Sequence, residues 1–189
     1  DLFISESGDV FYTMKRVQGR TLRDLIEDLR RADPETVRRY TPAALIGIFR
    51  SACQAVAYAH QQGYIHRDLK PENIMVGDFG EVLLMDWGVA RAFDDAEETL
   101  EAFSPEEGVT LHSTLDGAVV GSPAYMAPES LQGHVAELGP QSDVFSLGVI
   151  LYELLTLRRP FGAENLARLM YLVVRGEFIP PAESAPDRE

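Results

Sequence analysis

The stretch HRDLKPENIMVGDFGEVLLMDW, residues 66–87, determines more about this chain than any other part of its sequence. Two short apolar runs, residues 74–76 and 82–85, are separated by Gly77-Asp78-Phe79-Gly80, whose residue types are typical of a turn. The pattern therefore predicts a β-hairpin. Such a hairpin would hold two carboxylates and an amide at one end of a cleft, namely Asp68, Asn73 and Asp86.

These polar side chains suit chemistry at a phosphate group. Asn73 and Asp86 carry the oxygen donors that a hard cation such as Mg²⁺ prefers, and so few protein ligands leave room for phosphate oxygens. Asp68 and Lys70 flank Leu69, so in an extended loop their side chains point the same way. A carboxylate beside an ammonium suits a hydroxyl that loses its proton while negative charge builds nearby. The stretch thus indicates phosphoryl transfer.

Composition limits the class of protein. The 189 residues, 46% hydrophobic and 25% charged, suffice for one soluble globular domain with a core. A net charge of -13 argues against nucleic-acid binding, which needs a basic face. Cys53 is the single cysteine, so no internal disulfide is expected. No apolar run reaches the length of a membrane span, so we expect no membrane segment in this chain.

Capping signals predict two helices before residues 66–87. Thr21 is a good N-cap for a short helix, residues 22–31. Thr41, followed by proline, opens a longer amphipathic helix, and Gly63 has the residue type that ends one. Residues 2–14 have the pattern of a strand, a turn and a second strand.

The second half of the chain begins with an acidic segment. Residues 92–120 carry acidic side chains without Lys or Arg and show little apolar periodicity, which indicates a long loop. Asp143 is expected to cap a helix over residues 144–152, which is apolar nearly all round and should therefore be buried at the centre. A last helix is expected over about residues 163–175.

Four motifs give the chain a resemblance to a known family. In order, they are HRDLKPEN at 66–73, DWG at 86–88, GSPAYMAPE at 121–129 and DVFSLGVILYELLT at 143–156. The chain resembles the eukaryotic-type (Hanks-type) serine/threonine protein kinases, and a bacterial member is indicated.

The resemblance implies an α+β, protein-kinase-like fold. Residues 1–17 would be a remnant of the N-lobe, a β-hairpin followed by the hinge, and residues 18–189 a mostly helical C-lobe truncated at its C-terminus. Within the C-lobe, residues 66–73 would form the catalytic loop and residues 86–129 the activation segment.

The resemblance also assigns roles at the reaction centre. Asp68 resembles the base that orients the substrate hydroxyl and accepts its proton, and Lys70 resembles the lysine that neutralises the transferring phosphoryl group. Asn73 and Asp86 resemble the two Mg²⁺ ligands. Asp78 is a second candidate, because Asp78-Phe79-Gly80 spells the metal motif literally. An apolar run still follows that triplet, so Asp86 is preferred.

Further positions would bind the nucleotide. Met14 would guard the back of the adenine pocket, the backbone of Lys15 to Val17 would form the hinge, and Met75 would lie under the adenine ring. His66 is interpreted as a packing and hydrogen-bonding residue. Trp87 stands where the family usually has Phe.

Other positions would regulate the site or support it. Arg67 resembles the arginine that grips a phosphorylated activation loop. Ser122 resembles the residue that favours Ser/Thr substrates, and Asp143 would brace the catalytic loop. Glu129 would normally pair with an arginine further on, which we expect to be absent from this chain. Candidate phosphorylation sites in the acidic loop are Thr110, Ser113 and Thr114.

Together these residues predict a partial catalytic domain that transfers the ATP γ-phosphate to Ser/Thr hydroxyls of protein substrates. ATP and Mg²⁺ would be its cofactors, a dimer would serve autophosphorylation, and the domain would lie in the cytoplasm, with any membrane anchor in a segment of the parent not present here. The alternative is a non-catalytic pseudokinase or interaction module. Because the family's Gly-rich loop and strand lysine cannot be placed, we expect the fragment alone to be inactive.

Overall fold

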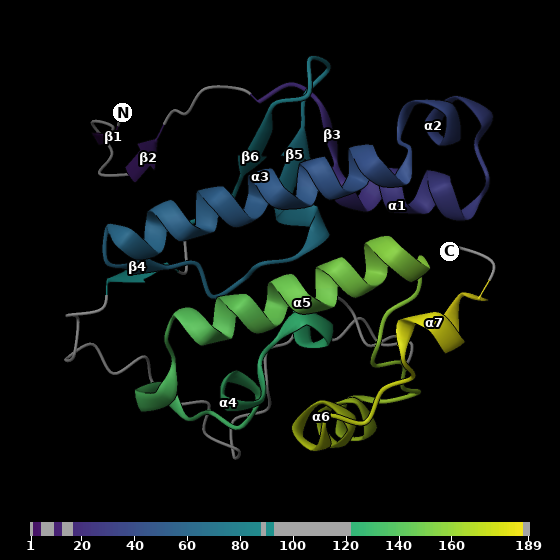
Figure 1. Cartoon of the computed structure of the whole chain (residues 1–189). Coiled ribbons are helices and arrows are strands. Elements are labelled where there is room, and N and C mark those ends of the chain that lie inside the picture. The colour runs from purple at the N-terminus through teal and green to yellow at the C-terminus, as the bar shows by residue number, and fades with distance from the viewer. Residues whose placement is uncertain (1, 5–9, 13–16, 88–89, 93–121, 187–189) are drawn as a thin grey trace.

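The computed structural model describes residues 2–4, 10–12, 17–87, 90–92 and 122–186. Its architecture is α+β, as predicted: helices make up most of the described chain, and a small three-stranded antiparallel sheet packs against one side of them (Figure 1). Among the described helices, none is long and apolar enough to cross a membrane.

The predicted central hairpin is confirmed. Strand β5 (Ile74–Val76) pairs antiparallel with β6 (Val82–Leu84), and Ile74 faces Leu84 across the ladder. A short strand, β3 (Arg20–Thr21), pairs with the other edge of β5. Gly19 leads into β3 with φ +139°, and a Cβ there would lie 2.4 Å from the carbonyl oxygen of Val76, so only glycine fits this approach.

The first helices begin where their capping residues predict. Helix α1 (Leu22–Arg30) has a capping box between Thr21 and Asp24, and α3 (Pro42–Gln61) begins after the Thr41 side chain. Gly63 ends α3 with φ +84°. A short helix that we did not predict, α2 (Pro34–Arg39), connects α1 to α3.

Helix α5 (Pro140–Thr156) begins earlier than predicted. Its N-cap is Gly139, with Pro140 in the first turn, whereas Asp143 was expected to cap the helix. Asp143 instead lies inside the first helical turn, and its buried carboxylate contacts another part of the chain. The cap prediction was wrong because an aspartate early in a helix fits both positions equally well.

The remaining elements are short. The predicted N-terminal hairpin consists of β1 (Leu2–Ile4) and β2 (Val10–Tyr12), and β4 (Tyr64–Ile65) pairs with β7 (Arg91–Ala92). The last predicted helix, α6 (Leu166–Arg175), begins later than expected because the Asn165 side chain caps it. The other pieces are the 3-10 turns η1 (Pro71–Asn73), η2 (Ser122–Tyr125) and η3 (Val135–Glu137) and the helices α4 (Pro128–Leu131) and α7 (Pro181–Ser184).

The core joins the sheet to the helices. Its members with no exposed surface come from α1, α3, β5 and α5, and are Leu22, Leu25, Ile26, Ala52, Ile74 and Ile150. Helix α1 follows β3 directly and contributes to this core. The helix and the sheet therefore hold each other in place next to residues 66–73. Burial of this apolar surface is the main stabilising contribution.

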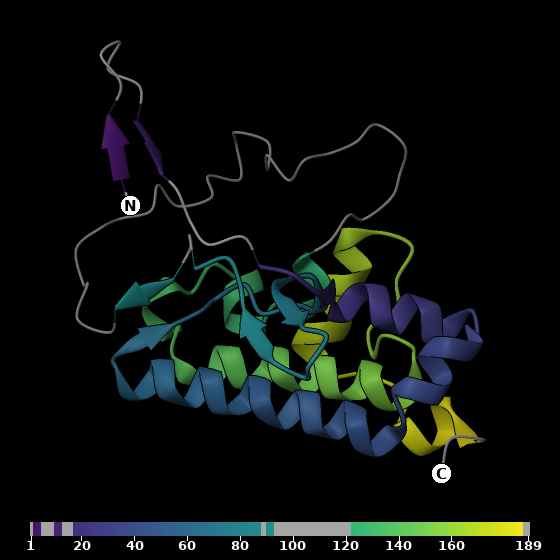
Figure 2. The same cartoon turned by 90° about the horizontal axis from the view of Figure 1, so that it is seen from above.

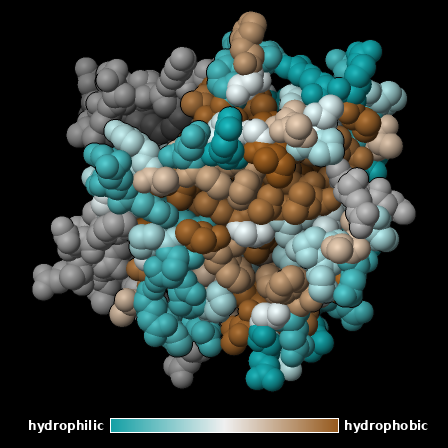
Figure 3. Space-filling view, in the orientation of Figure 1, coloured by the Kyte–Doolittle hydropathy of each residue, from teal (hydrophilic) through white to brown (hydrophobic). Residues whose placement is uncertain are grey.

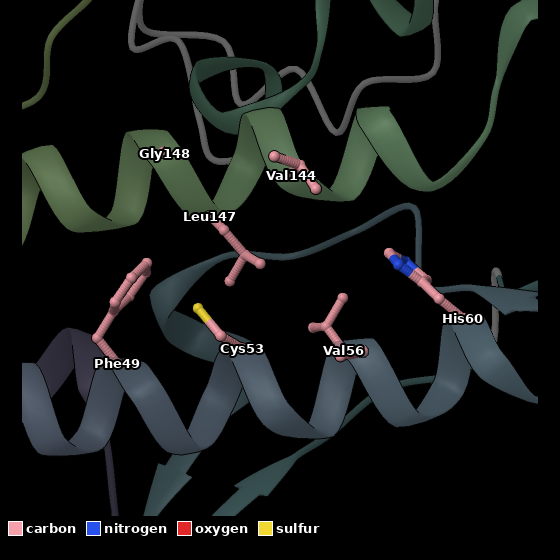
Figure 4. Close-up of a pocket in the computed structure, with 8 residues that line it drawn as sticks. Phe49, Cys53, Val56, His60, Val144, Leu147 and Gly148 are labelled. Atoms are coloured by element: carbon pink, nitrogen blue, oxygen red, sulfur yellow. The ribbon is translucent and has the colours of Figure 1, made fainter.

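Helix α5 is not buried all round, which corrects our expectation of a fully central helix. Figures 1 and 2 show α5 beside α3, and the two helices leave a groove of about 380 Å³ between them. Val144 on its rim is 60% exposed. Figure 3 shows apolar side chains gathered on this face. In Figure 4, Cys53 and Leu147 line the groove, and burial raises the pKa of the Cys53 thiol.

Candidate active site

Asp143 of α5 holds the start of the predicted catalytic loop, residues 66–73, in place. The Asp143 carboxylate accepts hydrogen bonds from the backbone N–H groups of His66, at 2.8 Å, and Arg67, at 2.9 Å. The ring of His60, at the end of α3, contacts the same carboxylate at 2.7 Å. Arg67 has φ +68°, a conformation that costs a non-glycine residue about 1–2 kcal/mol. The two hydrogen bonds to Asp143 help to offset that cost.

The loop brings Asp68, Lys70 and Asn73 together. Lys70 Nζ lies 2.5 Å from Asp68 Oδ2, and the side-chain amide of Asn73 donates to Asp68 Oδ2 at 3.1 Å and to the Asp68 carbonyl at 2.9 Å. The Asp68 and Lys70 side chains are 20% and 19% exposed. The carboxylate is therefore fixed in direction and still open to a bound substrate.

The hairpin separates Asp86 from Asp78. The N–H of Met85 donates to the Asn73 carbonyl at 2.8 Å, so Asp86 follows β6 at the end of the hairpin that holds Asn73. Asp78 lies in the turn at the opposite end, with a side chain that is 79% exposed. Of the two aspartates, Asp86 is the one that shares an end of the hairpin with Asp68 and Asn73.

Two aromatic rings cover this end of the hairpin. His66 is buried, and its Nε2 lies 3.0 Å from the carbonyl oxygen of Met85. The Trp87 ring packs against the His66 ring, with centroids 4.6 Å apart, and its Nε1 donates to the Leu84 carbonyl at 3.2 Å. Trp87 therefore holds the first two residues of the predicted activation segment, residues 86–129, against the hairpin.

The donor set of Asn73 and Asp86 fits Mg²⁺. The Asn73 amide nitrogen is used by Asp68, which leaves its Oδ1 as the acceptor of that side chain. Asp86 is exposed and supplies a carboxylate. Two protein oxygens are typical of magnesium sites that also use phosphate and water, because this ion gives up its waters reluctantly.

The structure describes only some of the other predicted site residues. Val17 is half-buried before β3, Met75 lies in β5, and Ser122 begins η2. Glu129 Oε1 accepts a hydrogen bond from Ser142 Oγ at 2.6 Å. The predictions for Met14, Lys15, Thr110, Ser113 and Thr114 fall outside the described residues.

Sequence reasoning missed a buried group of charges next to the loop. Arg23 of α1 bonds to Glu153 of α5, to Glu72 of η1 and to Tyr125 of η2. Glu153 is 0% exposed. One signal was available: Glu153 is an isolated acid within the apolar run of α5, and buried acids are rare unless they are paired.

Comparison with known proteins agrees with this geometry. The family model of the protein kinase domain matches residues 2–184. The chain is 44% identical over 191 residues to serine/threonine-protein kinase PknD of Protochlamydia amoebophila, covering 98% of this chain and 19% of that protein. It is 38% identical over 190 residues to the PknD of Chlamydia pneumoniae, covering 98% and 20%. The chain thus spans about a fifth of the length of these curated relatives.

The fold and the ordered motifs define a domain of the phosphoryl-transfer class. The chain belongs to the protein kinase domain family, and the resemblance inferred from its four motifs is confirmed.

Proposed function

We propose that the full-length protein containing this chain transfers the γ-phosphate of ATP to serine or threonine hydroxyls of proteins. The contact between Lys70 Nζ and Asp68 Oδ2, at 2.5 Å, is the observation that carries the proposal. This contact supports the proposal, because a carboxylate beside an ammonium suits a hydroxyl that loses its proton next to a phosphate. The relatives are named serine/threonine-protein kinases, which supports the choice of acceptor.

The transfer needs little covalent chemistry from the protein. Asp68 orients the substrate hydroxyl and accepts its proton as the oxygen bonds to the γ-phosphorus and the bond from that phosphorus to ADP breaks. Lys70 offsets the negative charge on the transferring group, and Asn73 holds the Asp68 carboxylate in place. Asn73 and Asp86 would hold Mg²⁺, which supplies charge neutralisation at the phosphates when bound.

The nucleotide and the regulatory contacts extend this proposal. Adenine would lie between the hinge, Lys15 to Val17, and Met75 of β5, with Met14 at the back of its pocket. Arg67 would bind a phosphate carried by the activation segment. Transfer between two copies of the protein would place that phosphate on Thr110, Ser113 or Thr114. We place the reaction in the cytoplasm, where ATP is supplied.

The test is a phosphotransfer assay on the full-length protein with labelled ATP, Mg²⁺ and a Ser/Thr-containing protein substrate. Asp68→Asn keeps the side-chain shape and removes the proton acceptor, so it is expected to lower the rate about 100-fold or more. Glu164→Gln, an equal charge change on an exposed loop, is the control and should keep the wild-type rate. An Asp68→Asn variant as active as wild type, or label found on tyrosine, would refute the proposal.

A further inference from the structure

Arg23 joins three elements that are far apart in the sequence. Its Nη1 donates to Glu153 Oε1 on α5 at 2.9 Å, and its Nε donates to Glu72 Oε1 on η1 at 2.9 Å. Its Nη2 donates to the hydroxyl of Tyr125 on η2. The side chain is 11% exposed, so one nearly buried guanidinium uses all three of its nitrogens on three different elements.

Charge and hydrogen bonding explain why this buried group is stable. Burial alone would raise the pKa of Glu153, but hydrogen bonds from Arg23 and Tyr125, and the charges of Arg23 and Arg30, hold its pKa below the ordinary value. Tyr125 donates to Glu153 Oε2 at 2.5 Å. Burial and the charge of Glu153 raise the pKa of Tyr125, so its hydroxyl keeps the proton that it donates.

The group connects residues 68–73 with the last part of the predicted activation segment. Glu72 directly precedes Asn73, whose amide holds the Asp68 carboxylate. Tyr125 closes η2 (Ser122–Tyr125), and its carbonyl accepts from Ser146 Oγ of α5 at 2.7 Å. Under the proposed kinase function η2 would contact the polypeptide substrate, so we call it the docking segment. Through Glu72 and Tyr125, Arg23 fixes the distance between the catalytic loop and the docking segment.

We propose that Arg23 is a positioning residue that holds the docking segment against the catalytic loop and thereby sets the affinity for the polypeptide substrate. This inference rests on the proposed kinase function. Because the link runs to Glu72 and Tyr125, its loss would displace the polypeptide relative to Asp68 and leave the nucleotide contacts of β5 in place.

Arg30 offers a matched control. Its Nη2 donates to Glu153 Oε1 at 2.5 Å, and its Nε donates to the Leu157 carbonyl at 2.6 Å, so these contacts run to α5 and the residue that follows it. Replacing Arg23 or Arg30 therefore removes one positive charge from the same buried carboxylate. Only replacement of Arg23 also breaks the hydrogen bonds to Glu72 and Tyr125.

Steady-state kinetics of the full-length protein test the inference. Arg23→Met is expected to raise KM for the polypeptide substrate about tenfold with KM for ATP unchanged, whereas Arg30→Met should change neither. Arg23→Lys keeps the positive charge but loses the planar guanidinium with its several donors. Its KM for the polypeptide should therefore lie between the values of the wild type and of Arg23→Met. Equal effects of the Arg23 and Arg30 variants, or equal changes of both KM values, would overturn the inference.

Amide hydrogen exchange on the same proteins tests the coupling without activity. Arg23→Met is expected to speed exchange in both the catalytic loop and the docking segment, and Arg30→Met in neither. Unchanged exchange in the Arg23 variant would refute the coupling. A protein that transfers no phosphate would refute the kinase function alone, because the exchange result still decides the role of Arg23.

Discussion

Asp86 and Asp78 show how position gives two identical side chains different chemistry. Each is followed by an aromatic residue and a glycine in the sequence. The β5–β6 ladder places Asp78 in the exposed turn, where its carbonyl accepts from Arg39 Nη2 at 2.7 Å. Asp86 instead follows β6, next to Met85, whose N–H is bonded to the Asn73 carbonyl. An oxygen donor can share a cation with Asn73 only from the latter place.

The first prediction compares these two aspartates in the full-length protein. Asp86→Asn is expected to abolish measurable phosphotransfer, because a neutral amide binds Mg²⁺ more weakly than a carboxylate does. Asp78→Asn is expected to leave the rate within about twofold of wild type, since it alters only an exposed turn. A phosphotransfer assay across a range of Mg²⁺ concentrations measures both. The reverse ranking would contradict the assignment.

At the scale of elements, local signals predicted helix ends well and long-range contacts poorly. Thr21, Thr41 and Gly63 act within a few residues of themselves, so the ends that they determine could be read from the sequence. The carboxylate of Asp143 serves the backbone of His66 instead of its own helix. No local pattern reveals a partner so far away in the chain, and the start of α5 was therefore placed too late.

A pair of glycines tests the packing of β3 against β5. Gly19→Ala is expected to lower the free energy of unfolding by about 1–3 kcal/mol, because its φ is +139° and the new methyl would meet the Val76 carbonyl oxygen. Gly47 lies in α3, where a Cβ added to it would meet nothing within 4 Å. Gly47→Ala should therefore raise the free energy of unfolding by about 0.5–1 kcal/mol.

Urea denaturation of the two glycine variants measures both effects. Because the substitution is the same, any general effect of adding a methyl group cancels in the comparison. A Gly19→Ala variant at least as stable as wild type would show that the approach of residue 19 to β5 does not constrain the fold.

At the scale of the whole molecule, the contacts among Asp68, Lys70 and Asn73 could be predicted because these residues lie within one short stretch, residues 66–87. The charged group around Glu153 could not, because it joins α1, η1, η2 and α5 across most of the chain. The exposed face of α5 was also missed. An apolar helix pattern predicts burial, but it does not say which neighbour covers each face.

The last prediction concerns the dependence of stability on pH. The folded state holds the pKa of Glu153 below its ordinary value of 4.5, so the ionised carboxylate binds protons less readily there than in the unfolded chain. Its contribution to stability is therefore fully present above pH 4.5 and is lost as the pH falls through the folded-state pKa.

Removing the Glu153 charge should show this contribution directly. Glu153→Gln leaves Arg23 and Arg30 without their shared carboxylate, so it should lower the free energy of unfolding at neutral pH by about 3 kcal/mol. Below pH 4.5 the difference between wild type and Glu153→Gln should shrink, since protonation removes the same charge from wild type. Urea denaturation at a series of pH values measures the difference, with Glu164→Gln as the exposed control. A difference that stays constant with pH would mean that the carboxylate is not the charge that joins these four elements.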